Sequence, residues 1–207
     1  MKDYEALSKA HFDRQAAQYD ERDTFYYSKE GKISCRDIEE RLAGEAYRAL
    51  LDVGCGTGFL IDRLAKRRGA EYVGLDLSPE MLKMARQKRI AGARFVQGTA
   101  DKLPFKAEAF DIVTCSQSFH HYPYPERAMR EALRVLRRGG LYILSDTGIG
   151  GIGGWFDNHV LFRLLRSGDC RTANRKGIAR EMEGAGFRVI ECRQVQGMIY
   201  TVIGKKA

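Results

Sequence analysis

Apolar and polar positions along the chain follow two periods, one typical of strands and the other typical of helices. Five short apolar runs predict strands at 49–53, 71–75, 94–97, 110–115 and 141–145. Helical spacing follows Gly58, Ser78 and Pro125. Because strands and helices take turns, the pattern predicts an α/β fold, with a doubly wound, Rossmann-like, mostly parallel sheet and helices on both faces.

Each of these helices is expected to turn an apolar face toward the sheet. The first should end at Gly69, and its inward residues are Leu60, Ile61, Leu64 and Ala65. The second should be capped by Ser78, whose hydroxyl can accept a hydrogen bond from the first turn. The third should close at Gly139–Gly140, and its inward residues are Met129, Ala132, Leu133 and Leu136.

The C-terminal part of the chain departs from this alternation. A helix is expected over 175–185, ending near Gly186, and two strands are expected at 187–195 and 198–203. A tight turn around Gln196 and Gly197 would join these strands. They would form an antiparallel pair at the edge and complete a seven-stranded sheet within a single domain of residues 1–207.

Two segments lie outside the alternation. Residues 1–46 precede the first strand and carry Phe12, Ala16 and Tyr19 at helical spacing, which predicts a helical lid segment. Residues 147–172 form an insertion with five glycines, followed by the apolar residues Trp155, Phe156, Leu161, Phe162, Leu164 and Leu165. Two interpretations fit this insertion equally well. It is either a glycine hinge leading to a lid over an apolar pocket or a helix packed on the sheet edge.

Composition places the chain among soluble, globular proteins. It has 207 residues, 44% of them hydrophobic, and no apolar run approaches the length of about 20 residues that a membrane span needs. The polar N-terminus predicts no signal peptide. Five cysteines without CxxC spacing predict a reducing, cytoplasmic setting and argue against disulfides and a zinc site.

The net charge of +8 raises the question of an acidic partner such as a nucleic acid or a lipid. Much of this charge lies at expected helix ends, for example at Lys66–Arg68 and Arg137–Arg138, where cations complement the helix dipole. The charge is therefore interpreted mainly as an ordinary basic surface.

The segment Leu50–Gly58 carries the most specific chemical signal. An apolar strand meets Asp52 and then turns into a helix through glycines at alternate positions, 54, 56 and 58. Glycine permits positive φ and removes the Cβ atoms that would block a ligand, and the first amides of the next helix are unpaired. The spacing is not G-x-G-x-x-G, because Phe59 follows the last glycine, and no G-K-[ST] follows, so a pyrophosphate cofactor and a P-loop are disfavoured.

Ligands of open parallel sheets bind beyond the carboxyl ends of the strands. Asp76 ends the second strand, 22 positions beyond Gly54, where a carboxylate can accept hydrogen bonds from both hydroxyls of a ribose. Asp101 follows the third strand and could receive the exocyclic amine of an adenine. Ser116–Tyr122 follow the fourth strand. These residues are expected to surround one nucleoside-like ligand.

With these residues in place, the chain resembles the class I S-adenosylmethionine-dependent methyltransferases. The matching pieces are LLDVGCGTG at 50–58, VGLDLSPEML at 73–82, GTADKLPF at 98–105, FDIVTCSQSFHHY at 110–122 and EALRVLRRGGLYILSD at 131–146. The third and fourth pieces are similar to the small-molecule branch typified by ubiquinone and menaquinone biosynthesis methyltransferases. The resemblance implies S-adenosylmethionine as the cofactor.

The resemblance also implies roles for single residues. The turn would let the backbone approach the methionine part of the cofactor; its residues are Gly54, Cys55, Gly56, Thr57 and Gly58. Asp52 would steady this turn and meet the ammonium group of the cofactor. Asp76 would hold the ribose, and Leu77 would line the adenine. The other implied cofactor residues are Ala100 and Asp101 at the adenine edge and Ser116 and Gln117 beside the sulfonium.

The segment FDRQAAQYD at 12–20 is similar to the helix that folds over the cofactor in this branch. Tyr19 is therefore either a residue of that lid or a tyrosine packed by its apolar face on the domain.

Methyl transfer from a sulfonium is an in-line displacement in which the protein mainly binds and orients. An acceptor hydroxyl would benefit from a general base, and His120 or His121 is the candidate, the alternative being a structural role in the cofactor pocket. No His, Cys and Asp residues show metal-ligand spacing, so no metal is expected.

The acceptor is expected to be a small molecule, hydrophobic or aromatic in view of the insertion. Ser116–Phe119 stand where enzymes that methylate nucleic-acid amino groups carry Asn/Asp-Pro-Pro-Tyr/Phe, which argues against a nucleic-acid partner. Two alternatives stay open. The chain could methylate RNA or protein, or it could bind S-adenosylmethionine without catalysis, and a screen for transfer of labelled methyl separates them.

Overall fold

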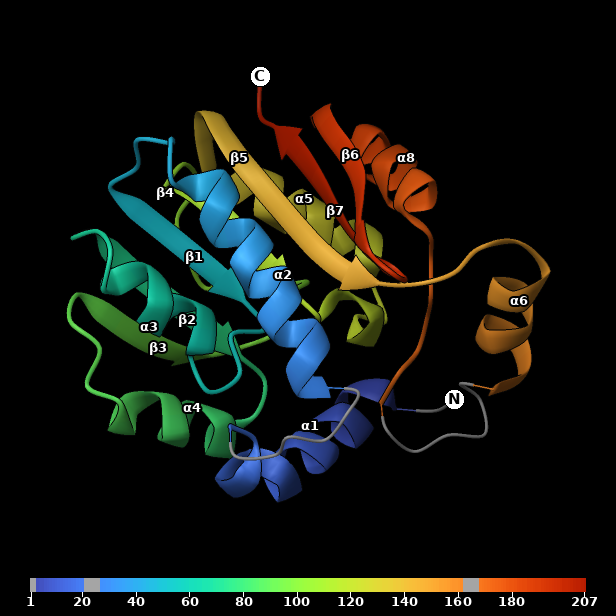
Figure 1. Ribbon diagram of the computed structural model, residues 1–207, viewed down its shortest axis with the longest axis horizontal. Coiled ribbons are helices and arrows are strands. Elements are labelled where there is room, and N and C mark those ends of the chain that lie inside the picture. Colours follow the sequence, from blue (N-terminus) through green and yellow to red (C-terminus); the bar gives the residue numbers. More distant parts are fainter. Residues whose placement is uncertain (1–2, 21–26, 162–167) are drawn as a thin grey trace.

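The computed structural model describes residues 3–20, 27–161 and 168–207. Within them, seven strands form one sheet in the order β3-β2-β1-β4-β5-β7-β6 (Figure 1). The strands are β1 (Ala49–Val53), β2 (Glu71–Asp76), β3 (Ala93–Gln97), β4 (Phe110–Ser116), β5 (Leu136–Thr147), β6 (Arg188–Gln196) and β7 (Ile199–Lys205). β1 to β5 run parallel, and β7 runs antiparallel to both β5 and β6. The predicted sheet is confirmed.

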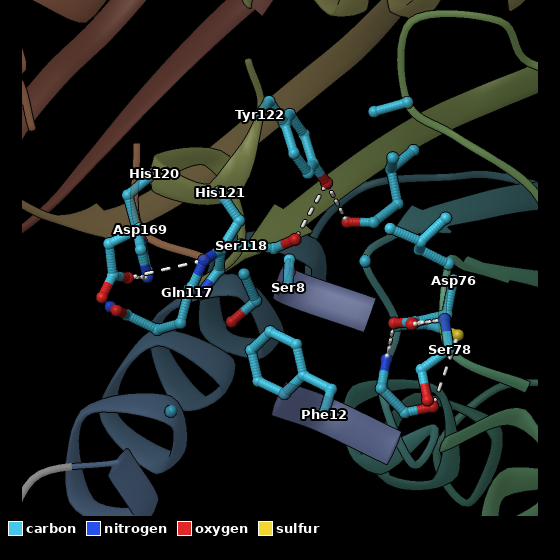
Figure 2. Close-up of a pocket in the computed structure, with 18 of the residues that line it drawn as sticks. Ser8, Phe12, Asp76, Ser78, Gln117, Ser118, His120, His121, Tyr122 and Asp169 are labelled. Carbon is cyan, nitrogen blue, oxygen red and sulfur yellow. Dashed lines mark hydrogen bonds and ion pairs between the residues drawn. The ribbon is translucent and has the colours of Figure 1, made fainter. Parts of the chain in front are cut away.

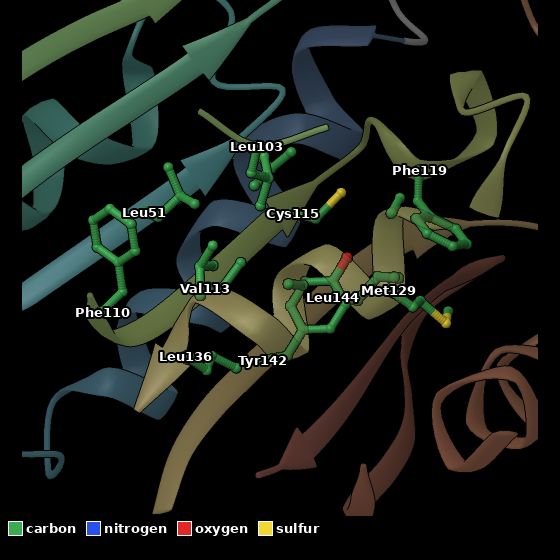
Figure 3. Packing of buried hydrophobic residues seen from close by; sticks show 14 of the residues in the cluster. Leu51, Leu103, Phe110, Val113, Cys115, Phe119, Met129, Leu136, Tyr142 and Leu144 are labelled. Atoms are coloured by element: carbon green, nitrogen blue, oxygen red, sulfur yellow. The ribbon is translucent and has the colours of Figure 1, made fainter. Parts of the chain in front are cut away.

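Helices cover both faces of the sheet (Figure 1). One face carries α2 (Tyr27–Leu42), α3 (Phe59–Ala65) and α4 (Pro79–Gln87), and the other carries α5 (Pro125–Val135) and α8 (Arg175–Ala185). Successive strand residues point to opposite faces, so Leu50 and Leu51 of β1 are both fully buried, each in a different core. Figure 3 shows the core on the face covered by α5 and α8, where Val113 and Leu144 of the sheet lie close to Met129 of α5.

The expected boundary between α5 and β5 is wrong. Leu136 was expected on the inward face of the helix, but its backbone is extended, and it pairs with Phe110 of β4 as the first residue of β5. The helical spacing continued through this position because Leu136 is buried in either arrangement. Gly139–Gly140 therefore lie inside a long strand, where they exchange backbone hydrogen bonds with Lys206, and do not close the helix.

The N-terminal segment is helical, as predicted, with α1 (Tyr4–Gln15) and a single 3-10 turn, η1 (Ala16–Gln18), before α2. In the insertion, α6 (Gly151–Phe156) begins inside the glycine run and continues into a short π-helical turn, η3 (Asp157–Leu161), so part of the expected hinge is helix. Figure 1 shows α6 standing away from the sheet, beyond the end of β5, and not packed along its edge. Phe162, Leu164 and Leu165 lie outside the described residues. That this insertion acts as a lid stays a prediction.

No helix among the described residues is both long enough and apolar enough to cross a lipid bilayer.

Candidate cofactor and acceptor site

A cavity of about 530 Å³ lies at the carboxyl ends of the parallel strands. Side chains of α1 line one part of it, and residues near the start of α2 line another. The predicted site residues that line it are Tyr19, Asp52, Gly54, Cys55, Gly56, Thr57, Asp76, Leu77, Ala100, Asp101, Ser116, Gln117, His120 and His121. Gly58 is the exception among the predicted residues. It precedes α3 with a φ of +76°, and a Cβ there would lie 3.1 Å from the ring of Phe95.

The glycines of the turn differ in what requires them. The amides of Gly54 and Cys55 both donate to the carbonyl of Leu75, 2.8 and 3.0 Å away, which fastens the turn to β2. A Cβ at Gly54 would lie 1.9 Å from Oγ of Ser118, so protein packing excludes a side chain there. A Cβ at Gly56 would meet no atom within 4 Å, although φ is +52°. Gly56 is therefore the position where bare backbone faces open space for a ligand.

Two carboxyl groups flank this turn, that of Asp76, which is half-buried, and that of Asp52, which is buried. Oδ2 of Asp76 accepts a hydrogen bond from the amide of Gly56 at 2.7 Å, and Oδ1 accepts one from the amide of Ser78 at 2.9 Å. A carboxylate has about four acceptor positions, so Asp76 keeps capacity for ligand hydroxyls. Asp52 is only 2% exposed and accepts a hydrogen bond from Oγ1 of Thr114 at 2.8 Å. Burial raises the pKa of Asp76, and it raises the pKa of Asp52 to about 7.

Residues 12–20 dock onto the loops that hold these acids. Asp20 accepts a hydrogen bond from Oγ1 of Thr57 at 2.6 Å and pairs with Lys88 at 2.8 Å. Asp13 accepts one from Oγ of Ser78 at 2.5 Å, and Ser78 also caps α4, as predicted. The segment thus lies against the loops that carry Thr57 and Ser78, and Tyr19 contributes to the lining of the cavity.

Gln117 forms hydrogen bonds to both α2 and β5, a contact that the sequence did not indicate. Its side-chain amide donates to Oγ of Ser34 in α2 at 2.8 Å, and its amide oxygen accepts from Oγ1 of Thr147 in β5 at 2.9 Å. Its φ is +49°, which is uncommon for a residue other than glycine and turns the chain sharply after β4. Gln117 therefore shapes the wall of the cavity between α2 and β5.

Tyr122 holds the loop after β4 against the end of β1, a role that the sequence did not reveal. Its hydroxyl donates to the carbonyl of Val53 and accepts from Oγ of Ser118, both at 3.0 Å (Figure 2). Burial raises the pKa of Tyr122 well above its ordinary value, so it remains a neutral phenol. The Gly54 turn is thus pinned from two sides, by Leu75 and by the Tyr122–Ser118 pair.

The two adjacent histidines have different surroundings (Figure 2). Nδ1 of His120 lies 2.7 Å from Oδ1 of Asp146, and the backbone amide of His120 donates to Oδ2 at 3.0 Å. Burial acts to lower the pKa of His120, but the charges of Asp146 and Asp169 outweigh it and raise this pKa. The side chain of His121 is only 9% exposed, and Nδ1 has no hydrogen-bond partner among the described residues. Burial, together with the neighbouring imidazole, lowers the pKa of His121.

Asp146 and Asp169 are functional candidates that the sequence reasoning missed. Asp146 lies near the carboxyl end of β5, so the rule applied to the first four strands would have found it. Oδ1 of Asp169 lies 3.6 Å from Nε2 of His120 and 3.4 Å from Nδ1 of His121. No periodicity or motif surrounds Asp169 in the insertion, so only the fold brings it to the histidines. The general-base role of His120 or His121 stays a prediction.

The cavity is acidic in a chain of net charge +8. Among the residues that the structure describes, eight carboxyl side chains line it against three from Lys and Arg. The acidic members are Glu5, Asp20, Glu30, Asp52, Asp76, Asp101, Asp157 and Asp169, and the basic ones are Lys9, Lys32 and Arg171. Such a lining favours a ligand that carries positive charge.

Comparisons with known proteins agree with this geometry. A family model described as a methyltransferase domain matches residues 51–144. Demethylmenaquinone methyltransferase of Chlorobaculum tepidum is 37% identical over 114 residues, which are 55% of this chain and 47% of that protein. Fatty-acid O-methyltransferase of Mycolicibacterium smegmatis is 42% identical over 101 residues, which are 48% of this chain and 37% of that protein. The chain thus spans about half the length, or less, of these curated relatives.

A solved structure of a proposed methyltransferase from Bacillus halodurans C-125 is 30% identical and superposes with a TM-score of 0.67. The match covers 76% of this chain and 70% of that one. The chain belongs to the class I S-adenosylmethionine-dependent methyltransferases and is similar within them to the menaquinone methyltransferases.

Proposed function

We propose that the protein transfers a methyl group from S-adenosylmethionine to a small, hydrophobic or aromatic acceptor. The observation that carries the proposal is a cavity that joins the open face of Gly56, the half-buried carboxyl of Asp76 and the polar loop after β4. Membership of the methyltransferase family supplies the chemical class.

The lining suits each part of the proposed cofactor. Asp76 would accept hydrogen bonds from the ribose hydroxyls, with Leu77 and Asp101 toward the adenine. The open backbone at Gly56 and the carboxyl of Asp52 would receive the methionine part. A bound ammonium would favour the ionised form of Asp52, because a nearby positive charge lowers the pKa that burial has raised. The acidic lining matches a cofactor that carries a sulfonium and an ammonium.

The cofactor supplies an electrophilic methyl group, and the chain has to orient the acceptor and exclude water. Holding the reacting atoms in near-attack geometry can lower a barrier by about 7–11 kcal/mol, so an in-line transfer does not require a catalytic side chain. Ser116 lines the cavity where the methyl group would be transferred. The hydrogen bonds of Gln117 to α2 and β5 hold the neighbouring wall of the cavity in place. Residues 12–20 would shield the cofactor from solvent.

The acceptor end of the cavity is bordered by apolar side chains. Three partly exposed side chains line it: Leu161, Met198 and Tyr124. They would form an apolar entrance beside α6 and η3. The relatives named above carry names that refer to a menaquinone precursor and to a fatty acid, both of them apolar acceptors. These observations support a hydrophobic acceptor over RNA or a protein side chain.

An acceptor hydroxyl would have to lose its proton, and His120 is the better placed of the two predicted bases. Asp146 holds its Nδ1, which leaves Nε2 on the side of Asp169. His121 is enclosed, with the edge of Phe12 against its ring at a centroid distance of 5.0 Å. We therefore predict that His120 acts as the general base toward an acceptor hydroxyl.

The test is a screen with S-adenosylmethionine labelled in its methyl group, using metabolite, lipid-extract and RNA fractions. Transfer into a small molecule of the lipid or metabolite fraction is expected, and the Asp76→Ala variant should abolish most of it. Label in the RNA fraction would support methylation of RNA and contradict the proposal. Cofactor binding without transfer to any fraction would support a non-catalytic binding protein and contradict the proposal.

A further inference from the structure

Three side chains with metal-binding atoms converge on one wall of the cavity. One ring nitrogen of His120, one ring nitrogen of His121 and a carboxylate oxygen of Asp169 all lie within 4.8 Å of one another (Figure 2). The two nitrogen-to-oxygen distances are 3.6 and 3.4 Å. A tetrahedral zinc ion with bonds of about 2.0–2.1 Å has edges between its ligands of roughly 3.3 Å. Two of the three edges are thus within a few tenths of an ångström of that value.

His120 already has the arrangement typical of a metal-binding histidine. Such residues usually donate their other ring nitrogen to a carboxylate, which fixes the tautomer and the orientation of the ring. Asp146 provides that carboxylate at 2.7 Å from Nδ1, and its second oxygen accepts the amide of His120. The lone pair of Nε2 is thereby directed to the side of Asp169.

His121 supplies an independent observation. Its side chain is more than nine-tenths buried, and Nδ1 has no hydrogen-bond partner among the residues that the structure describes. A buried polar atom without a partner costs about 1–3 kcal/mol, which a coordinated ion would offset. The ring also lies beside that of His120, with 4.2 Å between their centroids. His121 therefore presents a ring nitrogen without a hydrogen-bond partner among the described residues, 3.4 Å from the carboxylate of Asp169.

Asp169 is anchored where the ligands meet. The amides of Cys170 and Arg171 both donate to the carbonyl of His120, at 3.1 and 3.3 Å. On the other side, Gly168 has a φ of +87°, and a Cβ there would lie 2.5 Å from Cα of Ser8. The segment is thus held between α1 and the loop after β4, although Asp169 lies 48 positions after His121 in the sequence.

We propose that His120, His121 and Asp169 bind one divalent transition-metal ion of the zinc type, with Asp146 as the positioning carboxylate. Two imidazoles and one carboxylate form a three-ligand set that leaves a fourth position for another molecule. Since all three residues line the cavity, that position opens toward the acceptor. This last step rests on the proposed function. A hydroxyl or thiol of the acceptor would coordinate there and release its proton to solvent.

The proposal competes with the general-base prediction for one atom. Nε2 of His120 has a single lone pair, so it cannot coordinate an ion and accept a proton at the same time. In the metal-bound protein, the ion would take over the activation of the acceptor.

Direct binding of Zn²⁺ and Co²⁺ to tag-free protein tests the site. The protein is stripped with a chelator, the chelator is removed, and Zn²⁺ is titrated by calorimetry while Co²⁺ is followed by its visible absorption. One ion per chain is expected. Asp146→Asn should weaken binding by about 10- to 100-fold, as loss of an outer carboxylate does elsewhere, and Asp169→Asn by at least as much. His159→Gln is the matched control, because it removes an exposed imidazole from η3, and it should bind like the unmodified chain.

The proposal is overturned if the unmodified chain binds no Zn²⁺ at about 100 µM, or if Asp169→Asn binds as well as His159→Gln. Circular dichroism verifies that each variant is folded, and His121→Gln decides the matter should Asp169→Asn not fold. Titration of S-adenosylmethionine into the same samples separates the two proposals. Cofactor binding without zinc binding removes only the metal site, whereas zinc binding without cofactor binding removes the methyltransferase proposal.

Discussion

Replacing Tyr122 with Phe tests whether the phenol pins the cofactor turn. The change removes one oxygen atom and keeps the ring, which packs edge-on against Phe119 with 5.4 Å between ring centroids. Three hydrogen bonds are lost: one to the carbonyl of Val53, one from Ser118, and a longer one with Sγ of Cys115 at 3.6 Å. A typical hydrogen bond contributes about 0.5–1.5 kcal/mol, and a buried group left without its partner costs about 1–3 kcal/mol. We therefore expect the free energy of unfolding to fall by about 2 kcal/mol.

For a chain of 207 residues, this loss corresponds to a fall in melting temperature of about 4–8 °C. Denaturant unfolding measures the free energy directly, and the slope m should not change. Tyr124→Phe is the matched control, because Tyr124 is 43% exposed, and its loss should stay within about 0.5 kcal/mol. If Tyr122→Phe were no more destabilising than Tyr124→Phe, the reasoning about the pinned turn would be refuted.

Two further predictions concern the glycines of the turn and Asp111, which lies near the start of β4. Gly54→Ala should destabilise the fold, because its Cβ would collide with Ser118 at 1.9 Å, whereas Gly56→Ala should lose cofactor affinity with a smaller loss of stability; equal effects on melting temperature would contradict this. Burial alone would raise the pKa of Asp111, but Arg137 and two backbone amides outweigh it and lower this pKa. The ionised Asp111 therefore contributes its full stabilisation above about pH 4, and this contribution is lost as the pH falls further. Asp111→Asn should lose less stability on acidification than the unmodified chain. Denaturant unfolding from pH 7 to pH 3 measures this difference.

The strands could be predicted from the sequence because their signal is local. Five of them lie in short apolar runs bounded by turn residues, and the C-terminal pair is marked by Gly197 at the turn. The boundary at Leu136 could not be predicted, since burial demands an apolar residue in either a helix or a strand. Leu136 is in a strand because its backbone pairs with that of Phe110, which is 26 residues earlier in the sequence.

It could be predicted from the sequence that residues at the strand ends share one cavity, but not that Asp169 joins them. Asp76 and Gly56 follow strand ends, and strand ends meet at one edge of a parallel sheet. Asp169 follows no strand, and its position depends on main-chain hydrogen bonds to His120 and on the close approach of Gly168 to α1. Contacts of this kind have no periodicity, so no pattern in the sequence indicates them.

Calorimetric titration of S-adenosylmethionine tests the central claim most directly. The unmodified chain should bind one molecule per chain, and Asp76→Ala should weaken binding by about 1.5–3 kcal/mol, or roughly 10- to 150-fold, through loss of a charge-assisted hydrogen bond. Asp62→Asn is the control, because Asp62 pairs with Lys66 on α3, and it should bind normally. Undetectable binding to the unmodified chain at millimolar cofactor, or equal affinities for Asp76→Ala and Asp62→Asn, would contradict the account.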